Sequence, residues 1–467
     1  MTTMVALYDT LARAVVDVAP AGETFLMYSC GPTVYRYAHI GNLRTFLMAD
    51  LIRRTLEYQG TDVRQIQNIT DVGHMTDDQF DTGEDKMLVS AGLEGRSPEE
   101  IASFYTDAFL TDVAAINIQP AESYPRATEY IPQMIEIIAK LLERGHAYAA
   151  AGGVYFDVQS FPAYGRLSGN TLDKLVSGHR EVIDDPNKRH HADFLLWRPA
   201  GASRLMKWTS PWGDGFPGWH IECSAMSIAL LGETFDLHTG GEDNVFPHHE
   251  DEIAQSEGAV GHTVVRHWVH GAHLLSEGRK MAKSANNYYD VRDLAERGHN
   301  DPLAVRLLFL QSRYRAQMNF TLDALGAAER GLARWRRLVA NGAASGETGA
   351  AGSADPYEKR FVDALNDDLD MPTVMALVSE VVSSPAIAPG DKAALLQRWD
   401  RVLGLGLGRE VGVVREFPEA AKELIEQREK ARLKKDFSTA DRIRHKLLSL
   451  GVEVEDTPDG PKPRWVQ

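Results

Sequence analysis

Cysteine is nearly absent from this chain, which has only Cys30 and Cys223 among its 467 residues. Two cysteines cannot build a disulfide framework, and no run of about 18 or more apolar residues is present that could span a membrane. The first residues also lack the basic stretch and apolar core of a secretory signal. We therefore expect a cytoplasmic protein in a reducing environment, with no membrane partner.

Positive charge is scarce as well, because 50 Lys and Arg residues face 66 Asp and Glu residues and leave a net charge of −16. Such a balance argues against indiscriminate binding to nucleic acid, which requires clustered Lys and Arg side chains. Residues 422–446 are a local exception, since nine basic residues outnumber five acidic ones there. The remaining composition is that of an ordinary globular protein with two or three domains.

The hydrophobic pattern near the start of the chain predicts a parallel α/β sheet. Glu23–Cys30 is an apolar run typical of a buried strand, Leu43–Tyr58 has apolar residues at helical spacing, and Val63–Ile69 is a second strand. The pattern resumes near Phe235–His238 and Thr263–His270. In sheets of this kind, ligands bind at the carboxyl ends of the strands.

The pattern changes between and beyond these strands. Residues 120–200 predict an insertion with one helix, Ile131–Arg144, one strand, Val154–Val158, and loops rich in Gly, Pro and Asp. The last third of the chain is mostly helical, with a flexible Gly-, Ala- and Ser-rich linker at Ala343–Asp355. The final unit, Glu419–Gln467, predicts a helical pair and a short tail punctuated by Gly and Pro.

Both cysteines lie in segments with other reactive side chains. Cys30 ends the first predicted strand, and Cys223 precedes a run of residues that can bind metal. The members of that run are His238, Glu242, Asp243, His248, His249, Glu250 and Glu252. Two thiolates with an imidazole and a carboxylate suit a tetrahedral zinc site. Two buried, inert cysteines would give the same pattern.

The spacing inside this run narrows the choice of ligands. Pro247 is placed to start a helix. His248 and Glu252 are four residues apart and so share one face of that helix. His249 and Glu250 are expected to point elsewhere. An acidic helix N-terminus stabilised by the helix dipole is the alternative interpretation.

Three further segments have features of a nucleotide site. His39-Ile40-Gly41-Asn42 falls where a strand leads into a helix, whose N-terminal N–H groups attract phosphate. Lys280-Met281-Ala282-Lys283-Ser284 is a basic loop that suits the charge formed when pyrophosphate leaves ATP. In His238–Asp243, paired glycines allow close backbone approach to a base or ribose. Each segment alone is a weak signal, since a loop histidine, a solvated basic turn or a Gly-rich turn has the same residues.

The order and spacing of these segments are more specific than any one of them. CGPTVY, HIGN, GWHIEC, HTGGED, FPHHEDE and KMAKS occur in that order. Together they resemble a class I aminoacyl-tRNA synthetase, specifically cysteinyl-tRNA synthetase. The resemblance covers essentially the whole chain and includes DFSTADRIRHKLLSLGVEVEDTPDGPKPRW near the carboxyl end.

The resemblance implies an α/β fold with a Rossmann-like catalytic domain. That domain is split by a connective insertion and followed by a helical bundle and a small anticodon-binding domain. The expected limits are 1–119 for the first catalytic half, 120–200 for the insertion, 201–279 for the second half with the zinc site, 280–320 for the KMSKS-like loop and stem-contact fold, 321–412 for the bundle, and 413–467 for the anticodon-binding domain.

The resemblance also assigns residues to roles. It places four zinc ligands at Cys30, Cys223, His248 and Glu252. It places the cysteine pocket at Gly31, Thr70 and Trp219. It assigns ATP contacts to His39, Gly41, Asn42, Gly241, Asp243 and Lys283. The catalytic groups among these segments are His39, Asn42, Lys280 and Lys283.

The implied reaction has two steps. Cysteine is activated by ATP, with Mg²⁺, to cysteinyl-adenylate and is then transferred to the 3′-terminal adenosine of tRNA(Cys). One zinc ion per chain would select the substrate thiol, because the harder hydroxyl of serine is a poor ligand in its place. We expect the enzyme to act as a monomer.

The chain departs from the family pattern at two positions. Asn42 replaces the second histidine of the HIGH motif, and Ala282 replaces the first serine of KMSKS. Asparagine keeps an N–H donor but cannot become cationic. An acidic segment, His74–Lys86, follows Thr70 and is interpreted as a solvated loop, with a mobile flap near the site as the alternative.

Two other functions remain open at this point. A cysteine ligase of the mycothiol-biosynthesis type resembles the same catalytic core but attaches cysteine to a small-molecule amine and lacks a full RNA-binding region. A catalytically inactive paralogue that only binds RNA is suggested by Asn42 and Ala282 alone. The basic residues of 422–446, with Trp465 available to stack on a base, favour tRNA. A solvated helix and a small core would have the same residues.

Overall fold

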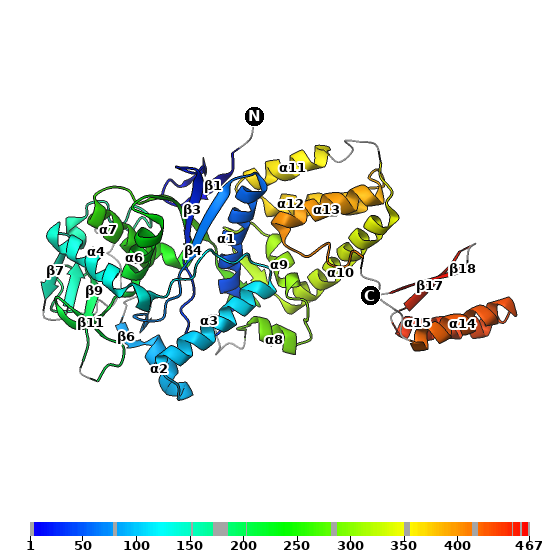
Figure 1. The fold of residues 1–467 in the computed structure, drawn as a ribbon, viewed down its shortest axis with the longest axis horizontal. Coiled ribbons are helices and arrows are strands. Elements are labelled where there is room, and N and C mark those ends of the chain that lie inside the picture. The colour runs from blue at the N-terminus through cyan, green and yellow to red at the C-terminus, as the bar shows by residue number, and fades with distance from the viewer. Residues whose placement is uncertain are drawn as a thin grey trace.

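The computed structural model describes residues 4–77, 82–150, 153–170, 185–201, 203–281, 287–349, 355–412, 419–450, 452–457 and 460–465. Figure 1 shows an α/β region that contains both the central sheet and an inserted sheet, followed by a bundle of long helices and a small unit at the carboxyl end. No helix in the described ranges combines the length and hydropathy needed to cross a membrane.

A four-stranded parallel sheet forms the centre of the α/β region. Its strands are β3 (Thr24–Ser29), β4 (Asp62–Gln67), β12 (Phe235–Gly241) and β13 (Val265–Gly271), in the order β13-β12-β3-β4. The chain moves outward from β3 to β4 on one side and from β12 to β13 on the other. The gap between the ends of β3 and β12 is therefore a topological switch point, where open parallel sheets bind their ligands.

Helices pack against the sheet, as the sequence predicts for an α/β domain. α1 (Ile40–Tyr58) contacts β4, β12 and β13, and α6 (Trp219–Leu231) contacts β3 and α7 (Glu250–Val260). α1 begins three residues earlier than predicted. The predicted fold class, a Rossmann-like α/β domain followed by helices, is confirmed.

The insertion is more regular than the sequence indicates. It contains α4 (Ile131–Glu143) and a five-stranded antiparallel sheet. The strands of that sheet are β7 (Ala147–Ala150), β8 (Gly153–Phe156), β9 (Phe194–Pro199), β10 (Trp208–Ser210) and β11 (Gly213–Pro217). The helix matches the prediction, but only β8 was expected among the strands. Gly, Pro and Asp near these short strands favoured a prediction of loops.

Short elements complete the α/β region. They are β1 (Ala6–Asp9), β2 (Ala14–Asp17), β5 (Met75–Asp77), β6 (Thr82–Asp85), α2 (Lys86–Glu94), α3 (Pro98–Ala115), β14 (Leu274–Ser276), β15 (Arg279–Lys280), α8 (Val291–Glu296), α9 (Leu303–Leu310) and β16 (Met318–Phe320). Short helical turns lie at Ala127–Tyr130, Val158–Ser160, Glu242–Asn244 and Val245–His249.

The acidic segment after Thr70 is not a solvated loop throughout. β5 and β6 pair as a hairpin, although residues 78–81 lie outside the described part. At its base, Asp85 is buried and caps α2 by accepting the N–H of Met87 at 2.9 Å. His74 and Lys86 are also buried, with the ring nitrogen Nε2 of His74 2.8 Å from Lys86 Nζ. The base of the segment is therefore part of the folded core.

Among the described residues, the bundle contains four helices. They are α10 (Leu322–Ser345), α11 (Asp355–Asn366), α12 (Met371–Ser383) and α13 (Pro389–Leu403). The predicted linker Ala343–Asp355 is shorter than expected, because α10 continues to Ser345 and α11 starts at Asp355. Residues 350–354 of that linker lie outside the described part.

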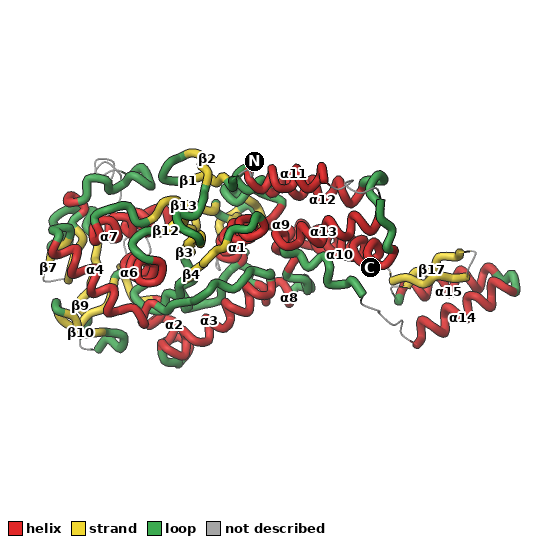
Figure 2. Tube along the Cα trace, turned by 45° about the horizontal axis from the view of Figure 1, so that its top comes forward, coloured by secondary structure: helices red, strands yellow, loops and turns green. Residues whose placement is uncertain are grey.

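The carboxyl-terminal unit has its own small core. Figure 2 shows α14 (Glu419–Leu433) and α15 (Phe437–Ser449) side by side, with β17 (Val452–Thr457) next to them. The predicted tail is a β-hairpin of β17 and β18 (Gly460–Trp465). Buried apolar residues from the helices and β17 form a cluster separate from the main core. They are Ala421, Ile443, Leu447, Val452 and Val454.

A candidate metal centre and active site

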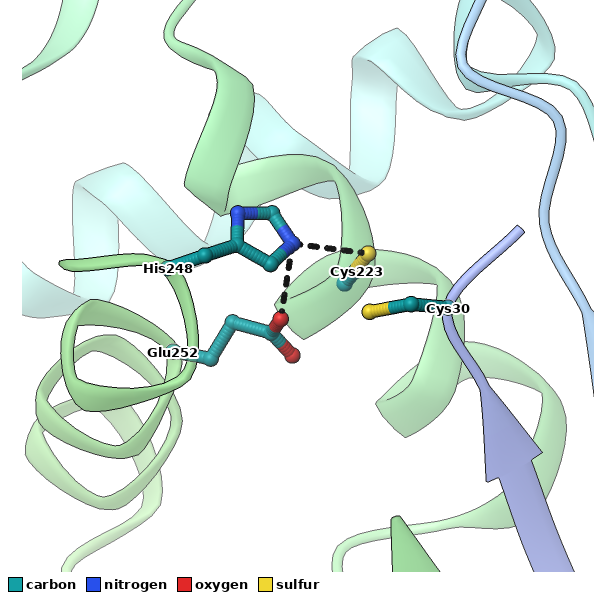
Figure 3. A group of neighbouring side chains, drawn as sticks. All are labelled: Cys30, Cys223, His248 and Glu252. Carbon is teal, nitrogen blue, oxygen red and sulfur yellow. Dashed lines mark hydrogen bonds and ion pairs between the residues drawn. The ribbon is translucent and has the colours of Figure 1, made fainter. Parts of the chain in front are cut away.

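Four side chains from three distant segments meet at the switch point of the sheet. Cys30 follows β3, and its N–H donates to the carbonyl of Thr239 on β12 at 2.9 Å. Cys223 comes from α6, His248 from the turn Val245–His249 and Glu252 from α7. Figure 3 shows the two thiols, the imidazole and the carboxylate pointing toward one another. The four residues that the sequence predicts as zinc ligands are thus brought together.

The distances in this cluster suit a shared metal ion. One ligand atom from each of the four residues lies within 4.8 Å of the other three, and all four residues are buried. His248 Nε2 is 3.6 Å from Cys223 Sγ and 3.0 Å from Glu252 Oε1. Glu252 Oε1 forms ion pairs with His248 and His249 but makes no hydrogen bond of good geometry in the described part of the chain. A buried polar atom of this kind requires a partner, and a metal ion would supply one.

The chemistry of the donor set fits zinc. A hydrogen bond with Cys30 and burial raise the pKa of Cys223 well above its usual value, and burial also raises the pKa of Cys30. Burial alone would raise the pKa of Glu252, but the charges of His238 and His248 outweigh it and lower that pKa to about 2. A divalent cation reverses the preference of both thiols, because it binds the thiolate form. Two sulfurs, one nitrogen and one oxygen are ligands that zinc accepts.

Two further histidines, His238 and His249, contact two of the predicted zinc ligands. The ring nitrogens of His238 and His249 also lie within 4.8 Å of ligand atoms of Cys30 and Glu252. His249 Nε2 is 3.1 Å from Cys30 Sγ, and His238 Nε2 is 2.9 Å from Glu252 Oε2. The prediction that His249 points elsewhere is therefore wrong. Glu250 does face away, with its carboxylate in a separate set of hydrogen bonds.

The helix that carries Glu252 starts later than predicted. α7 begins at Glu250, because Phe246 is extended, with φ −145° and ψ 131°, and Val245–His249 forms a separate turn. Pro247 therefore lies in the turn and does not start the helix. His248 and Glu252 still face each other across the boundary.

The residues predicted for the cysteine pocket border this cluster. The N–H of Gly31 donates to Asn68 Oδ1 at 2.8 Å, and a Cβ at Gly31 would lie 1.6 Å from the carbonyl oxygen of Asn68. Only glycine fits there. The ring of Trp219 stacks on His248, with centroids 4.2 Å apart, and on His74, with centroids 3.9 Å apart.

Thr70 contacts Glu222, a residue that the sequence analysis did not select. Its hydroxyl donates to Glu222 Oε2 at 2.9 Å, and both side chains are buried. Burial raises the pKa of Glu222 well above its usual value. Glu222 lies inside GWHIEC, but the motif alone does not show whether its carboxylate faces Thr70 or the solvent. That orientation comes from the packing of α6.

His39 and Asn42 cap the N-terminus of α1 for each other. The N–H of Asn42 donates to His39 Nδ1 at 3.1 Å, and the N–H of His39 donates to Asn42 Oδ1 at 3.2 Å. Because Nδ1 accepts, the ring proton sits on Nε2, which stays available as a donor. Burial and the charge of Arg36 lower the pKa of His39 to about 4, so the ring is neutral at pH 7. The departure at Asn42 thus completes a helix cap.

The two predicted ATP segments adjoin each other. A Cβ at Gly41 would lie 2.5 Å from Met281 Cε and 2.9 Å from the ring of His39, so glycine leaves the room that both side chains occupy. Lys280 ends β15, which pairs with β14. Lys283, with Ala282 and Ser284, lies outside the described residues.

The Gly-rich segment after β12 lies where the sequence predicts a nucleotide contact. Gly241 ends β12, and its N–H donates to Asn244 Oδ1 at 2.9 Å. Asp243 is exposed in the turn that follows. Both residues come from the strand that borders the switch point, which is where a bound ribose is expected.

Comparison with known protein families and curated proteins shows the family of the chain. The family profile described as "tRNA synthetases class I (C) catalytic domain" matches residues 18–330, and the profile "Cysteinyl-tRNA ligase anticodon binding domain" matches residues 414–462. The chain is 44% identical to the cysteine–tRNA ligase of Salinibacter ruber over 504 residues, which cover 97% of each chain. It is 43% identical to that of Thermus thermophilus over 482 residues, which cover 98% of each.

Solved structures share the fold at low sequence identity. The methionyl-tRNA synthetase of Mycobacterium tuberculosis in complex with methionyl-adenylate has a TM-score of 0.59 at 15% identity and covers 82% of this chain and 89% of that one. The LeuRS–tRNA–LeuAMS ternary complex of Agrobacterium radiobacter gives 0.58 at 12% identity, over 83% and 84% of the chains. At these identities the likeness concerns the fold alone.

Proposed function

The chain belongs to the cysteine–tRNA ligase family of class I aminoacyl-tRNA synthetases, and we propose that it selects cysteine with the buried Cys–His–Glu cluster and activates it at the capped end of α1. Members of this family are ATP-dependent ligases, so the chain joins L-cysteine to tRNA. The observation that carries the proposal is the convergence of four ligand atoms, from three separate segments, at the switch point of the sheet.

In this proposal Cys30, Cys223, His248 and Glu252 hold one zinc ion per chain. Bound zinc supplies a centre that prefers a substrate thiolate over the hydroxyl of serine, which suits discrimination of about 10⁴ without an editing site. His249 and Trp219 hold the ligands in place, because His249 Nε2 is 3.1 Å from Cys30 Sγ and the Trp219 ring stacks on His248.

The activation step uses the two adjoining ATP segments. The cysteine carboxylate attacks the α-phosphorus of ATP with Mg²⁺ bound to the nucleotide, and pyrophosphate leaves. Such transfers depend on positioning and on stabilising the developing charge. His39 offers Nε2–H as a neutral, directed donor to phosphate, and Lys283 supplies positive charge. Gly241 and Asp243 border the ribose. The cysteinyl group then passes to the terminal adenosine of tRNA(Cys).

Two substitutions at His39 separate its role in the cap from its role in the reaction. Asparagine caps helices well, so His39→Asn should keep the stability of the chain while the Nε2 donor is lost. We expect cysteine-dependent ATP–pyrophosphate exchange to slow by roughly 10²-fold. His39→Ala should slow exchange equally and also lower the free energy of unfolding by about 1 kcal/mol. Exchange at the normal rate in the His39→Asn protein would exclude the imidazole from the reaction.

The carboxyl-terminal unit is the proposed anticodon reader. Its helices α14 and α15, with the turn between them, carry the basic excess of residues 422–446 in an otherwise acidic chain. Phosphate binding requires such a local change of sign. Arg464 and Trp465 belong to β18, and a cation and an aromatic ring are the groups that bind an unpaired base.

Removal of the carboxyl-terminal unit should separate activation from tRNA recognition. The unit has its own core, so truncation near Arg415 should leave the catalytic domain folded. We expect cysteine-dependent ATP–pyrophosphate exchange at the full rate, and aminoacylation that needs a much higher tRNA concentration. The two assays on both proteins measure this directly. Equal tRNA charging by the truncated and full-length proteins would show that the unit does not read RNA.

The other two functions suggested by the sequence are not favoured. A small-molecule cysteine ligase would lack the anticodon-binding region, which the family profile matches at residues 414–462. An inactive RNA-binding paralogue rested on Asn42 and Ala282, and Asn42 completes the α1 cap. Pyrophosphate exchange with cysteine, followed by addition of tRNA, distinguishes all three functions in one series.

The remaining sequence predictions stay part of the proposal. They are the six domain limits, a monomeric enzyme and a cytoplasmic location. The position of the insertion sheet between the two halves of the central sheet along the chain supports the order of these domains. The sheet includes β10 and β11 and so extends to Pro217, beyond the predicted limit of 200. Sedimentation of the purified protein would test the monomer.

A further inference from the structure

The segment His39–Asn42 offers phosphate a helix N-terminus but no charged side chain. His39 is neutral at pH 7, because burial and the charge of Arg36 lower its pKa to about 4. Asn42 stands where the HIGH motif has its second histidine, and an amide cannot become cationic. Negative charge builds up on pyrophosphate as it leaves ATP, and a fixed cation stabilises it. A cation beside this segment would supply the charge that its own side chains lack.

Arg36 is such a cation, three residues before His39. Its guanidinium lies over two tyrosine rings, with Cζ 4.9 Å from the centroid of Tyr35 and 5.5 Å from that of Tyr288. A guanidinium is attracted to the face of an aromatic ring, so these contacts hold the charge in place although Arg36 is exposed. The ring of Tyr288 also meets the ring of His39 edge to face, with centroids 5.2 Å apart. Arg36 and His39 therefore contact the same ring.

Tyr288 connects this group to the second ATP segment. It comes four residues after KMAKS in the chain. Its hydroxyl donates to the carbonyl of Tyr37 at 3.0 Å, and the N–H of Ile40 donates to the carbonyl of Tyr289 at 2.9 Å. The chain that follows KMAKS is thus fixed against the start of α1. Arg36 lies where these two segments meet, which is where the proposed function places the phosphates of ATP.

The guanidinium of Arg36 has no carboxylate of its own. Within the described ranges, no acidic side chain lies at ion-pair distance from it, and its side-chain N–H groups donate no hydrogen bond. Asp290 and Asp293, which follow Tyr288 in the chain, are engaged at the start of α8. Asp290 accepts the N–H of Arg292 at 2.8 Å, and Asp293 accepts the N–H of Asp290 at 3.0 Å. The planar fork of Arg36 is therefore available, and it matches two phosphate oxygens at once.

We propose that Arg36 binds the β- and γ-phosphates of ATP and stabilises pyrophosphate as it leaves. The inference rests on the proposed function, because it requires ATP to be bound between His39 and the KMAKS segment. Arg36 transfers no proton. The bond between the α-phosphorus and its bridging oxygen breaks, and the guanidinium hydrogen-bonds to the oxygens that take up the charge. Arg36 thus supplies, from a separate position, the positive charge that Asn42 cannot carry.

The test compares two ligands that differ at the pyrophosphate end. ATP carries the β- and γ-phosphates, whereas cysteinyl-sulfamoyl-adenosine, an analogue of the adenylate, carries neither. In the full-length, zinc-loaded protein, cysteine-dependent ATP–pyrophosphate exchange gives kcat/KM for ATP and KM for pyrophosphate. Calorimetry gives the Kd of the analogue.

Arg36→Gln removes the charge and keeps a polar side chain over the two rings. We expect kcat/KM for ATP to fall about 10- to 100-fold and KM for pyrophosphate to rise about 10-fold, while the Kd of the analogue stays within about 3-fold. Arg36→Lys keeps the charge without the fork and should recover part of both losses.

Arg96→Gln is the matched control. Arg96 is also an exposed arginine over an aromatic ring, with Cζ 4.8 Å from the centroid of Phe104, but it lies between α2 and α3. Its substitution should leave kcat/KM for ATP, KM for pyrophosphate and the Kd of the analogue unchanged.

The outcomes separate this inference from the proposed function. Unchanged constants for ATP and pyrophosphate in the Arg36→Gln protein would overturn the role of Arg36. An equal loss of affinity for the analogue would do the same, because it would show general damage to the nucleotide site. Normal exchange with a raised tRNA requirement in aminoacylation would assign Arg36 to RNA and also overturn the inference. If the unmodified chain catalysed no cysteine-dependent exchange, the proposed function itself would be wrong.

Discussion

Cys223→Ser should yield a protein that loses its metal and its ability to tell cysteine from serine. Cys223 lies in the buried cluster with its Sγ 3.6 Å from His248 Nε2, and serine cannot supply the thiolate that zinc prefers. We expect metal analysis of the purified protein to fall from roughly one zinc per chain to a small fraction of that. The preference for cysteine over serine in ATP–pyrophosphate exchange should fall by about 10²-fold or more.

A control on the same helix separates this effect from damage to the core. Met226→Leu changes a fully buried residue of α6 at nearly constant volume and should keep both the zinc and the preference. The assignment would fail if the Cys223→Ser protein retained a full complement of zinc and unchanged selectivity. It would also fail if zinc were retained through His238 and His249, the other histidines near Cys30 and Glu252.

Lys283→Ala should slow formation of cysteinyl-adenylate by roughly 10²-fold or more, which corresponds to about 3 kcal/mol of transition-state stabilisation. The residue lies outside the described part, but its loop starts at β15 and its neighbour Met281 lies against Gly41. The proposed function assigns this lysine to the phosphates of ATP. Because the charge matters most as pyrophosphate leaves, the affinity for cysteine should stay nearly unchanged.

Single-turnover kinetics with and without saturating cysteine would measure the two quantities separately. Lys283→Arg keeps the positive charge and should recover part of the rate. Weaker cysteine binding at an unchanged rate of activation in the Lys283→Ala protein would contradict the role given to this loop.

The parts of the fold that follow a regular period were predictable from the sequence. The strand ending at Ser29, the helix ending at Tyr58 and the strand that contains Val63 follow from runs of apolar residues at strand or helix spacing. The start of α1 was missed, because the features of His39 and Asn42 were interpreted as phosphate contacts. In the structure the same two side chains also cap the helix.

The antiparallel elements were harder to predict, because their stability comes from distant pairing. Val154 on β8 pairs with Trp197 on β9, and residues 171–184 between them lie outside the described part. In the carboxyl-terminal hairpin, Pro461 and Pro463 argued against a strand. A two-stranded hairpin tolerates proline at positions whose N–H would face away from the partner.

Site residues could be predicted from the sequence where few residues of a suitable type exist. They could not be predicted where the role depends on the direction in which a side chain points. Only two cysteines exist, and the spacing of His248 and Glu252 is helical, so these four residues could be grouped in advance. Glu222 is adjacent to Cys223, and both lie in one turn of α6. Periodicity cannot show that its carboxylate faces Thr70, because this depends on how α6 packs against the loop after β4.

The buried guanidinium of Arg306 is one of several contacts that join the α/β region to the helical bundle. Arg306 on α9 has no exposed side-chain surface, pairs with Asp50 of α1 at 2.7 Å and donates to the carbonyl of Leu403 at the end of α13. It also donates to the carbonyl of Asn117, just beyond α3, at 2.9 Å. Arg54 binds the same carboxylate of Asp50.

Rotation of the bundle against the sheet would break the buried hydrogen bonds that Arg306 and Arg54 donate to the carbonyls of Leu403 and Arg401, at a cost of about 1.5–3 kcal/mol for each charged donor. We therefore expect the distance from the aminoacylation pocket to the far end of the bundle to change little during the catalytic cycle. We expect adjustment to the length and bend of a tRNA to come mainly from the RNA itself or from residues beyond 412. The bundle is then a spacer of nearly fixed length. Exchange of the carboxyl-terminal unit between family members should preserve cysteine activation when the two sequences are joined after residue 412.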